Sequence, residues 1–82
     1  ENICYTDLVY ERINKKLGSN FSRNQIEDLM LKVIKKTDLE FFSKKGKNYY
    51  IENYEENIRI TVNSNTFRII TVDKLDQDNI IL

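Results

Sequence analysis

Residues 57–72 read Asn57-Ile58-Arg59-Ile60-Thr61-Val62-Asn63-Ser64-Asn65-Thr66-Phe67-Arg68-Ile69-Ile70-Thr71-Val72. Apolar and polar side chains alternate on both sides of a polar turn, which is the pattern of a β-hairpin. A two-residue turn at Ser64-Asn65 keeps the apolar side chains of both strands on one face. The cross-strand pairs expected on that face are Val62 with Phe67, Ile60 with Ile69, and Ile58 with Thr71.

Two amphipathic helices are expected before this hairpin, over about residues 7–17 and 23–36. Ser22 and Gln25 have the spacing of a capping box, which marks the start of the second helix. Apolar residues then recur at helical spacing, and they form the stripe Ile26, Leu29, Met30, Val33 and Ile34. We expect this stripe to face the core, with a helix–helix partner surface as the alternative.

Four strands are expected after the helices, over about residues 39–44, 47–52, 57–63 and 66–74. A four-residue loop between the second and third strands would place Ile51 beside Ile58. The apolar residues 80–82 would add a short strand or form an apolar end. A chain of 82 residues is long enough for a single domain, 1–82. The expected fold is α+β, with two N-terminal helices packed on one face of a four-stranded antiparallel sheet.

The absence of histidine restricts the chemistry of this chain. It excludes Ser-His-Asp and Cys-His catalysis and removes the commonest metal ligand. Cys4 is the only cysteine, and we expect it to be an apolar packing residue in a reducing compartment. Phosphate-binding glycine motifs and a membrane-spanning apolar run are also absent from the sequence. We therefore expect no cofactor, no metal and no membrane association.

The sheet face turned away from the helices is the candidate functional surface. Tyr50 is expected opposite Arg59, and Thr61 opposite Arg68. Arginine binds phosphate oxygens bidentately, tyrosine can stack on a base, and threonine can donate a hydrogen bond. The candidate catalytic residues are Arg59, Arg68, Tyr50 and Thr61, and the candidate RNA-binding residues are Lys45, Lys47 and Asn48.

This polar face has a second interpretation, because antiparallel sheets ordinarily present a polar face to water. Glu52 and Asp73 are likewise either an acid–base pair or ion-pair partners of nearby lysine and arginine. Formal charge is zero overall, with ten basic and seven acidic residues in 1–50 against three and six in 51–82. The lysines that close each helix favour the helix dipole or face a phosphate.

Four stretches of the chain are distinctive: residues 8–17 (LVYERINKKL), 45–51 (KGKNYYI), 58–66 (IRITVNSNT) and 69–71 (IIT). Together they resemble a family of short bacterial proteins catalogued as a domain of unknown function. The resemblance covers about residues 3–75 and implies a bacterial, cytoplasmic protein. It supplies no catalytic residues.

Two helices followed by four antiparallel strands are also similar to the metal-independent ribonuclease toxins of the barnase, colicin and RelE-like grouping. This fold-level similarity implies RNA cleavage on the exposed sheet face, with Arg59, Arg68, Thr61, Tyr50 and Lys47 in the corresponding places. The leading hypothesis is an RNA-directed protein, either a toxin-like ribonuclease or an RNA-binding module. The alternative is a non-enzymatic interaction module, which binds a protein partner through this face or through an exposed sheet edge. That partner would be antitoxin-like, or a second copy bound at the sheet edge.

Overall fold

The computed structural model describes residues 3–75 as two helices followed by a four-stranded antiparallel sheet. The helices are α1 (Asp7–Leu17) and α2 (Arg23–Lys36), and a short 3₁₀ turn, η1 (Leu39–Phe41), leads into the sheet. The strands are β1 (Phe42–Lys45), β2 (Asn48–Asn53), β3 (Ile58–Asn63) and β4 (Ile69–Lys74), in the spatial order β1-β2-β3-β4. The α+β fold expected from the sequence is confirmed. The expectation for residues 80–82 lies outside the described residues.

The two helices are held by local signals that the sequence displays. The Ser22 hydroxyl accepts a hydrogen bond from the Gln25 backbone N–H at 3.2 Å, and the Gln25 side chain accepts one from the Ser22 N–H at 2.8 Å. This is the expected capping box at the start of α2. Gly18 ends α1 with φ of 65°, a left-handed conformation that glycine adopts without a steric penalty.

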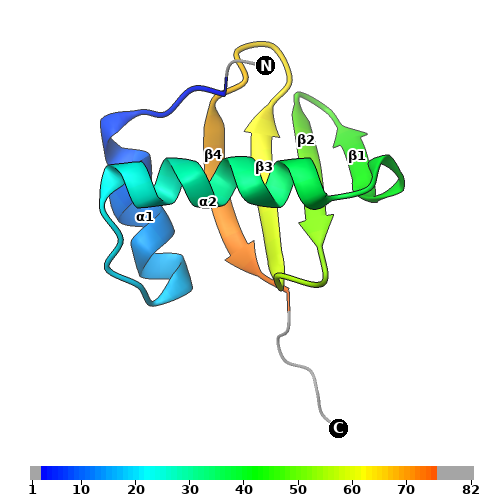
Figure 1. Ribbon diagram of the computed structural model, residues 1–82. Helices are drawn as coiled ribbons and strands as arrows, with labels where there is room; N and C mark the ends of the chain where they lie inside the picture. Colours follow the sequence, from blue (N-terminus) through cyan, green and yellow to red (C-terminus); the bar gives the residue numbers. More distant parts are fainter. Residues whose placement is uncertain (1–2, 76–82) are drawn as a thin grey trace, which may run out of the picture.

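The core lies between α2, α1 and one face of the sheet. Figure 1 shows α2 crossing that face in front of β4, β3 and β2, while α1 lies beside β4. The residues with no exposed surface are Ile13, Ile26, Met30, Val33, Ile60 and Val72. The Arg12 guanidinium donates to the Ile70 carbonyl at 3.2 Å, so α1 also covers part of the outer edge of β4.

The first two strands differ from expectation at their ends and in their register. Residues 39–41 form η1 rather than strand, because the chain must turn out of α2 before it can join the sheet edge. Ile51 pairs with Ile60 instead of Ile58. This is a shift of two residues, which leaves the same side chains on the same face.

The hairpin register expected from the sequence is wrong. Val62 pairs with Ile69, Thr61 with Thr71 and Ile60 with Val72, and the register shifts between Thr61 and Val62. The irregularity leaves Ile70 without a partner and lets both Ile69 and Val72 point into the core, at 2% and 0% exposed. The expected register would have placed Val72 on the polar face and Phe67 on the apolar face.

Candidate nucleic-acid interface

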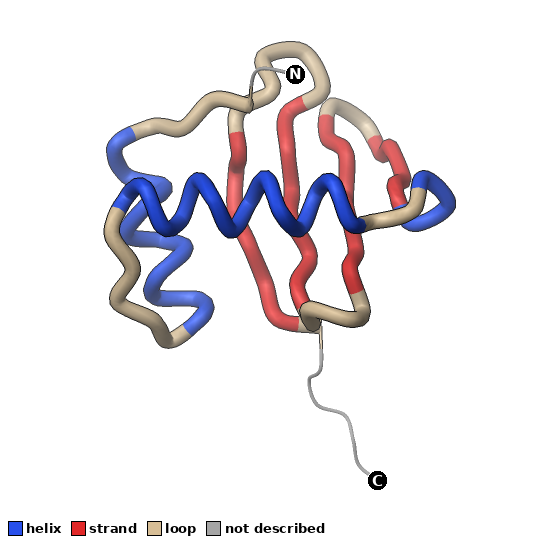
Figure 2. The backbone as a smooth tube through the Cα atoms, in the orientation of Figure 1, coloured by secondary structure: helices blue, strands red, loops and turns tan. Residues whose placement is uncertain are grey.

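The sheet has two chemically different ends. The β1–β2 and β3–β4 turns lie at one end, and the β2–β3 turn lies at the other, next to the end of β4 (Figure 2). We call the first the basic end, and define it as residues 43–48 and 63–68. We call the second the acidic end, and define it as residues 52–58 together with Asp73.

The basic end brings most of the predicted site residues together. Lys45 pairs with Asn48, and Asn48 pairs with Asn63. The Ser64 N–H donates to the Lys47 carbonyl at 2.7 Å, which joins the two turns directly. The Asn63 N–H donates to the Arg68 carbonyl at 2.9 Å. Lys45, Lys47, Asn48 and Arg68 therefore occupy one end of the sheet although they come from two separate hairpins.

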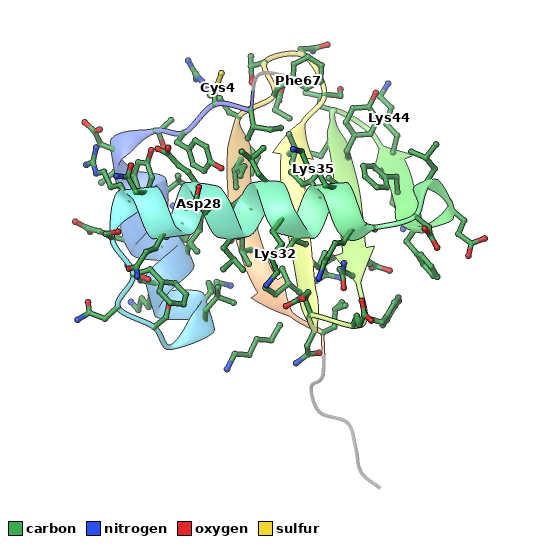
Figure 3. All side chains as sticks on the ribbon, viewed as in Figure 1. Cys4, Asp28, Lys32, Lys35, Lys44 and Phe67 are labelled. Carbon is green, nitrogen blue, oxygen red and sulfur yellow. The ribbon has the colours of Figure 1, made fainter. Side chains whose placement is uncertain are left out.

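The charge at this end is of one sign. Its four cationic residues are Lys44, Lys45, Lys47 and Arg68, and its two turns contain no aspartate or glutamate. All four are exposed, and none forms an ion pair within residues 3–75. Figure 3 places Lys44 and Phe67 on this side of the molecule, with Cys4 beside the Phe67 turn. The fold does not neutralise these charges, so they remain available to an anion.

Arg59, the leading predicted catalytic residue, lies toward the acidic end and is engaged in ion pairs. Its guanidinium lies 3.7 Å from a Glu52 carboxylate oxygen and 3.9 Å from one of Asp73. Asp73 also accepts a hydrogen bond from the Lys16 ammonium at 2.9 Å. Glu52 and Asp73 are thus ion-pair partners, the second of the two roles expected for them. A phosphate approaching Arg59 would have to compete with two carboxylates.

Tyr54 contributes to the same cluster. Its hydroxyl donates to Glu52 at 2.9 Å, and this hydrogen bond raises the pKa of Tyr54 above its ordinary value. The shift moves the phenol further from deprotonation than an ordinary tyrosine. A protonated phenol is a hydrogen-bond donor to its carboxylate neighbour and does not act as a general base.

Thr61 and Tyr50 do not have the neighbours expected from the sequence. They pair with each other, whereas Thr61 was expected opposite Arg68 and Tyr50 opposite Arg59. Thr61 lies between Tyr50 and Thr71 and is only 5% exposed. Tyr50 is half-buried and also pairs with Ser43, so it remains on the open face two residues from Asn48.

The sequence did not single out Phe67, which lies in the turn at the basic end. It was expected to pair with Val62 in the core, yet it is 45% exposed and has φ of 59°. Apolar–polar alternation along a strand would ordinarily predict that a large apolar residue such as Phe67 faces the core. The available signal is Asn63, whose side chain can cap a longer turn, as it does here by accepting from Asn65 N–H and Thr66 N–H at 2.9 Å each.

Two further features of the described residues complete the picture. Cys4, expected as a packing residue, is exposed. A shallow pocket of about 160 Å³ lies at the end of α2, beside Thr37, Phe41 and Asn53. The Asn53 amide donates to the Thr37 hydroxyl at 3.0 Å, and that hydroxyl donates to the Val33 carbonyl at 2.6 Å. The Thr37 and Asn53 side chains of this pocket thus link the end of α2 to β2.

Comparison with known proteins identifies the family. A family described as "Protein of unknown function (DUF3781)" matches residues 1–73. The chain belongs to this family. The resemblance to a domain of unknown function is thereby confirmed. No curated protein and no solved structure matches the chain. Within residues 3–75, no helix has the length and apolarity needed to cross a membrane.

Proposed function

We propose that this protein is an RNA-binding module and that the basic end of the sheet is its contact surface. One observation carries the proposal: four cationic side chains gather there without an ion pair among residues 3–75 and without an acidic residue in either turn. Lysine and arginine that neutralise phosphates supply most of the affinity of non-specific nucleic-acid binding. At the acidic end the carboxylates of Glu52, Glu56 and Asp73 are ion-paired instead.

The side chains around these cations suit an RNA strand. Arg68 has a planar fork that can hold two phosphate oxygens, and the lysines act as point charges. Asn48 and Tyr50 extend the surface along the open face of β2, where an amide and a half-buried ring are available to a base. Cations that would bind phosphates and side chains that would contact bases thus lie on one surface.

The geometry supports binding better than cleavage. A toxin-like ribonuclease using Arg59, Arg68, Tyr50 and Thr61 would need Arg59 to leave its two carboxylates and Thr61 to become accessible. Lys45, Lys47 and Arg68 need no such rearrangement. The ribonuclease hypothesis is tested in the same reaction, by following the integrity of the RNA on a denaturing gel.

The alternative interaction module would use the outer edge of β1, which no described residue pairs with. That edge strand has four residues, and two of them are Lys44 and Lys45. Short, lysine-bearing edges discourage the addition of another strand. The same lysines that favour an RNA ligand therefore disfavour strand pairing with a protein.

The test is the salt dependence of RNA affinity. A fluorescently labelled, unstructured RNA is titrated with the protein at several salt concentrations, using the double variant Lys45→Ala/Lys47→Ala. The matched control, Lys15→Ala/Lys74→Ala, removes two exposed lysines from elsewhere on the surface. Loss of two phosphate contacts should reduce the slope of log affinity against log salt by about 1.4.

The control should leave that slope unchanged. Absence of RNA binding by the unaltered protein, or equal slopes for the two double variants, would contradict the proposal. An unchanged slope of log affinity against log salt in Lys45→Ala/Lys47→Ala, together with a reduced slope in the control, would place the contact surface elsewhere.

A further inference from the structure

Phe67 occupies a backbone conformation that phenylalanine ordinarily avoids. Four described residues have positive φ, and the other three are Gly18, Gly46 and Asn57, types that tolerate it. A left-handed conformation destabilises a bulky L-residue by roughly 1–2 kcal/mol. A glycine or asparagine at Phe67 would therefore close the same turn with less strain.

The turn holds Phe67 in place from both sides. The Phe67 N–H donates to the Asn63 carbonyl at 2.8 Å, and the Phe67 carbonyl accepts from the Cys4 N–H at 2.8 Å. The Asn63 side chain fixes the preceding two backbone N–H groups, and the Thr66 hydroxyl accepts from the Arg68 N–H at 3.3 Å. The ring is thus carried by a backbone that is hydrogen-bonded on either side of it.

Phe67 lies outside the apolar core of the fold and is 45% exposed. Phe67 is neither in the buried core cluster nor among the partly buried apolar residues that pack against it. The ring pairs of the described residues are Tyr5 with Tyr10 and Phe41 with Tyr54, and neither includes Phe67. The strained conformation of Phe67 destabilises the turn without placing the ring in the core. An exposed aromatic ring next to cations without ion pairs is the combination found at base-stacking sites.

We infer that Phe67 is a stacking platform for an unpaired base, and that the RNA bound at the basic end is single-stranded. The inference rests on the proposed function and sharpens it. Arg68 follows Phe67 in the chain, and Lys47 joins the same turn through Ser64. A base on the ring would leave its flanking phosphates within reach of these two cations. A duplex keeps its bases stacked internally and cannot use the ring.

The test uses two substitutions of Phe67. Phe67→Asn removes the ring and keeps a residue suited to positive φ, so the turn is preserved. It should weaken binding of single-stranded oligouridine about 5- to 150-fold, the range for loss of one stacked base, and leave binding of an RNA duplex unchanged. Thermal unfolding of Phe67→Asn is the control that the fold is intact.

Phe67→Trp provides an independent readout, because the chain contains no tryptophan. It should retain oligouridine affinity, and its fluorescence should be quenched on binding the single strand and not the duplex. If Phe67→Asn binds oligouridine as well as the unaltered protein, or if Phe67→Trp is not quenched, the inference is overturned. The proposed function survives that outcome as long as Lys45→Ala/Lys47→Ala loses affinity, and it fails together with the inference if no RNA binds at all.

Discussion

Both ends of the sheet are formed by turns between neighbouring strands, but the residue types in those turns differ. Each contains a tight turn closed by one non-glycine residue with positive φ: Asn57 at 62° in the acidic end and Phe67 at 59° in the basic end. Asparagine is a usual choice for that conformation, and phenylalanine is not. The acidic end therefore follows the rules for a stable turn, whereas the basic end departs from them where it exposes a ring.

Their charges show the same division. In the acidic end Glu52 and Asp73 share Arg59, and Glu56 lies 3.8 Å from Lys32 and 4.0 Å from Lys36. These contacts tie β2, β3 and β4 to one another and the β2–β3 turn to α2. The cations of the basic end have no such partners among residues 3–75. The ion pairs of the acidic end thus contribute to the fold, while the cations of the basic end form none among the described residues.

The largest expected effect separates the core from the basic end. Ile60→Asp should unfold the protein, because it places a charge at a position with no exposed surface. Phe67→Asp should fold, because residue 67 is 45% exposed. Circular dichroism of the two variants measures this difference. Unfolding of Phe67→Asp would mean that Phe67 belongs to the core, and the contrast between the two ends would be lost.

Exchanging the positive-φ residues tests the two turns directly. Asn57→Phe should lower the free energy of unfolding by about 1–2 kcal/mol, because it introduces the strain that Phe67 already carries. Phe67→Asn should leave the free energy of unfolding unchanged or raise it, since relief of strain offsets the lost contacts of the ring. Urea denaturation of both variants gives the comparison. A larger loss for Phe67→Asn than for Asn57→Phe would show that the ring stabilises the fold.

Replacing Arg59, the partner of two acidic-end carboxylates, or Arg68 of the basic end tests the division of charge. Arg59→Ala should lower the free energy of unfolding by about 1 kcal/mol, because Glu52 and Asp73 lose their shared partner in a half-exposed network. Arg68→Ala should change it by less than about 0.5 kcal/mol, as expected for an exposed side chain without an ion pair. Equal losses, measured by urea denaturation, would mean that both arginines serve the fold.

The last effect is confined to alkaline pH and concerns the segment that leads from the basic end to α1. Burial, helped by nearby Glu27, raises the pKa of Tyr5 from 10.0 to about 12. Its neutral form is therefore favoured in the folded state, and the stability this provides is lost as pH rises from about 10 to about 12. Tyr5→Phe should reduce the fall in stability over that range. Unfolding of both proteins at matched pH checks it, and parallel curves would contradict it.

The helices and the inner sheet face could be predicted from the sequence. The start of α2 follows from the capping box of Ser22 and Gln25, and its buried face follows from the spacing of Ile26, Met30 and Val33. Both patterns involve only residues close in sequence, so they do not depend on how the rest of the chain folds. The faces of β2 and β3 also follow from alternation, because a slip of two residues keeps every side chain on its own face.

The hairpin register and the contacts of the candidate site could not be predicted from the sequence, because both depend on an irregularity in β4. A bulge at Ile70 changes the alternation within β4, and no period of two encodes it. Phe67 is apolar, so the same rule placed it inside. The partners of Arg59 depend on register, and an error of a few residues replaced Glu52 and Asp73 with Tyr50 as its expected neighbour. Lys45, Lys47 and Asn48 were predicted together because they share one short turn.

The most direct test of this account is to map where RNA contacts the protein. The ¹⁵N-labelled protein is titrated with oligouridine, and the backbone amide shifts are followed by NMR. We predict that the largest changes fall in residues 43–48 and 63–68, with Phe67 and Arg68 among them, and that residues 52–58 are unaffected. Changes centred on the acidic end or on the outer surface of α2, or no changes at all, would contradict the claim that the basic end is the RNA-binding surface.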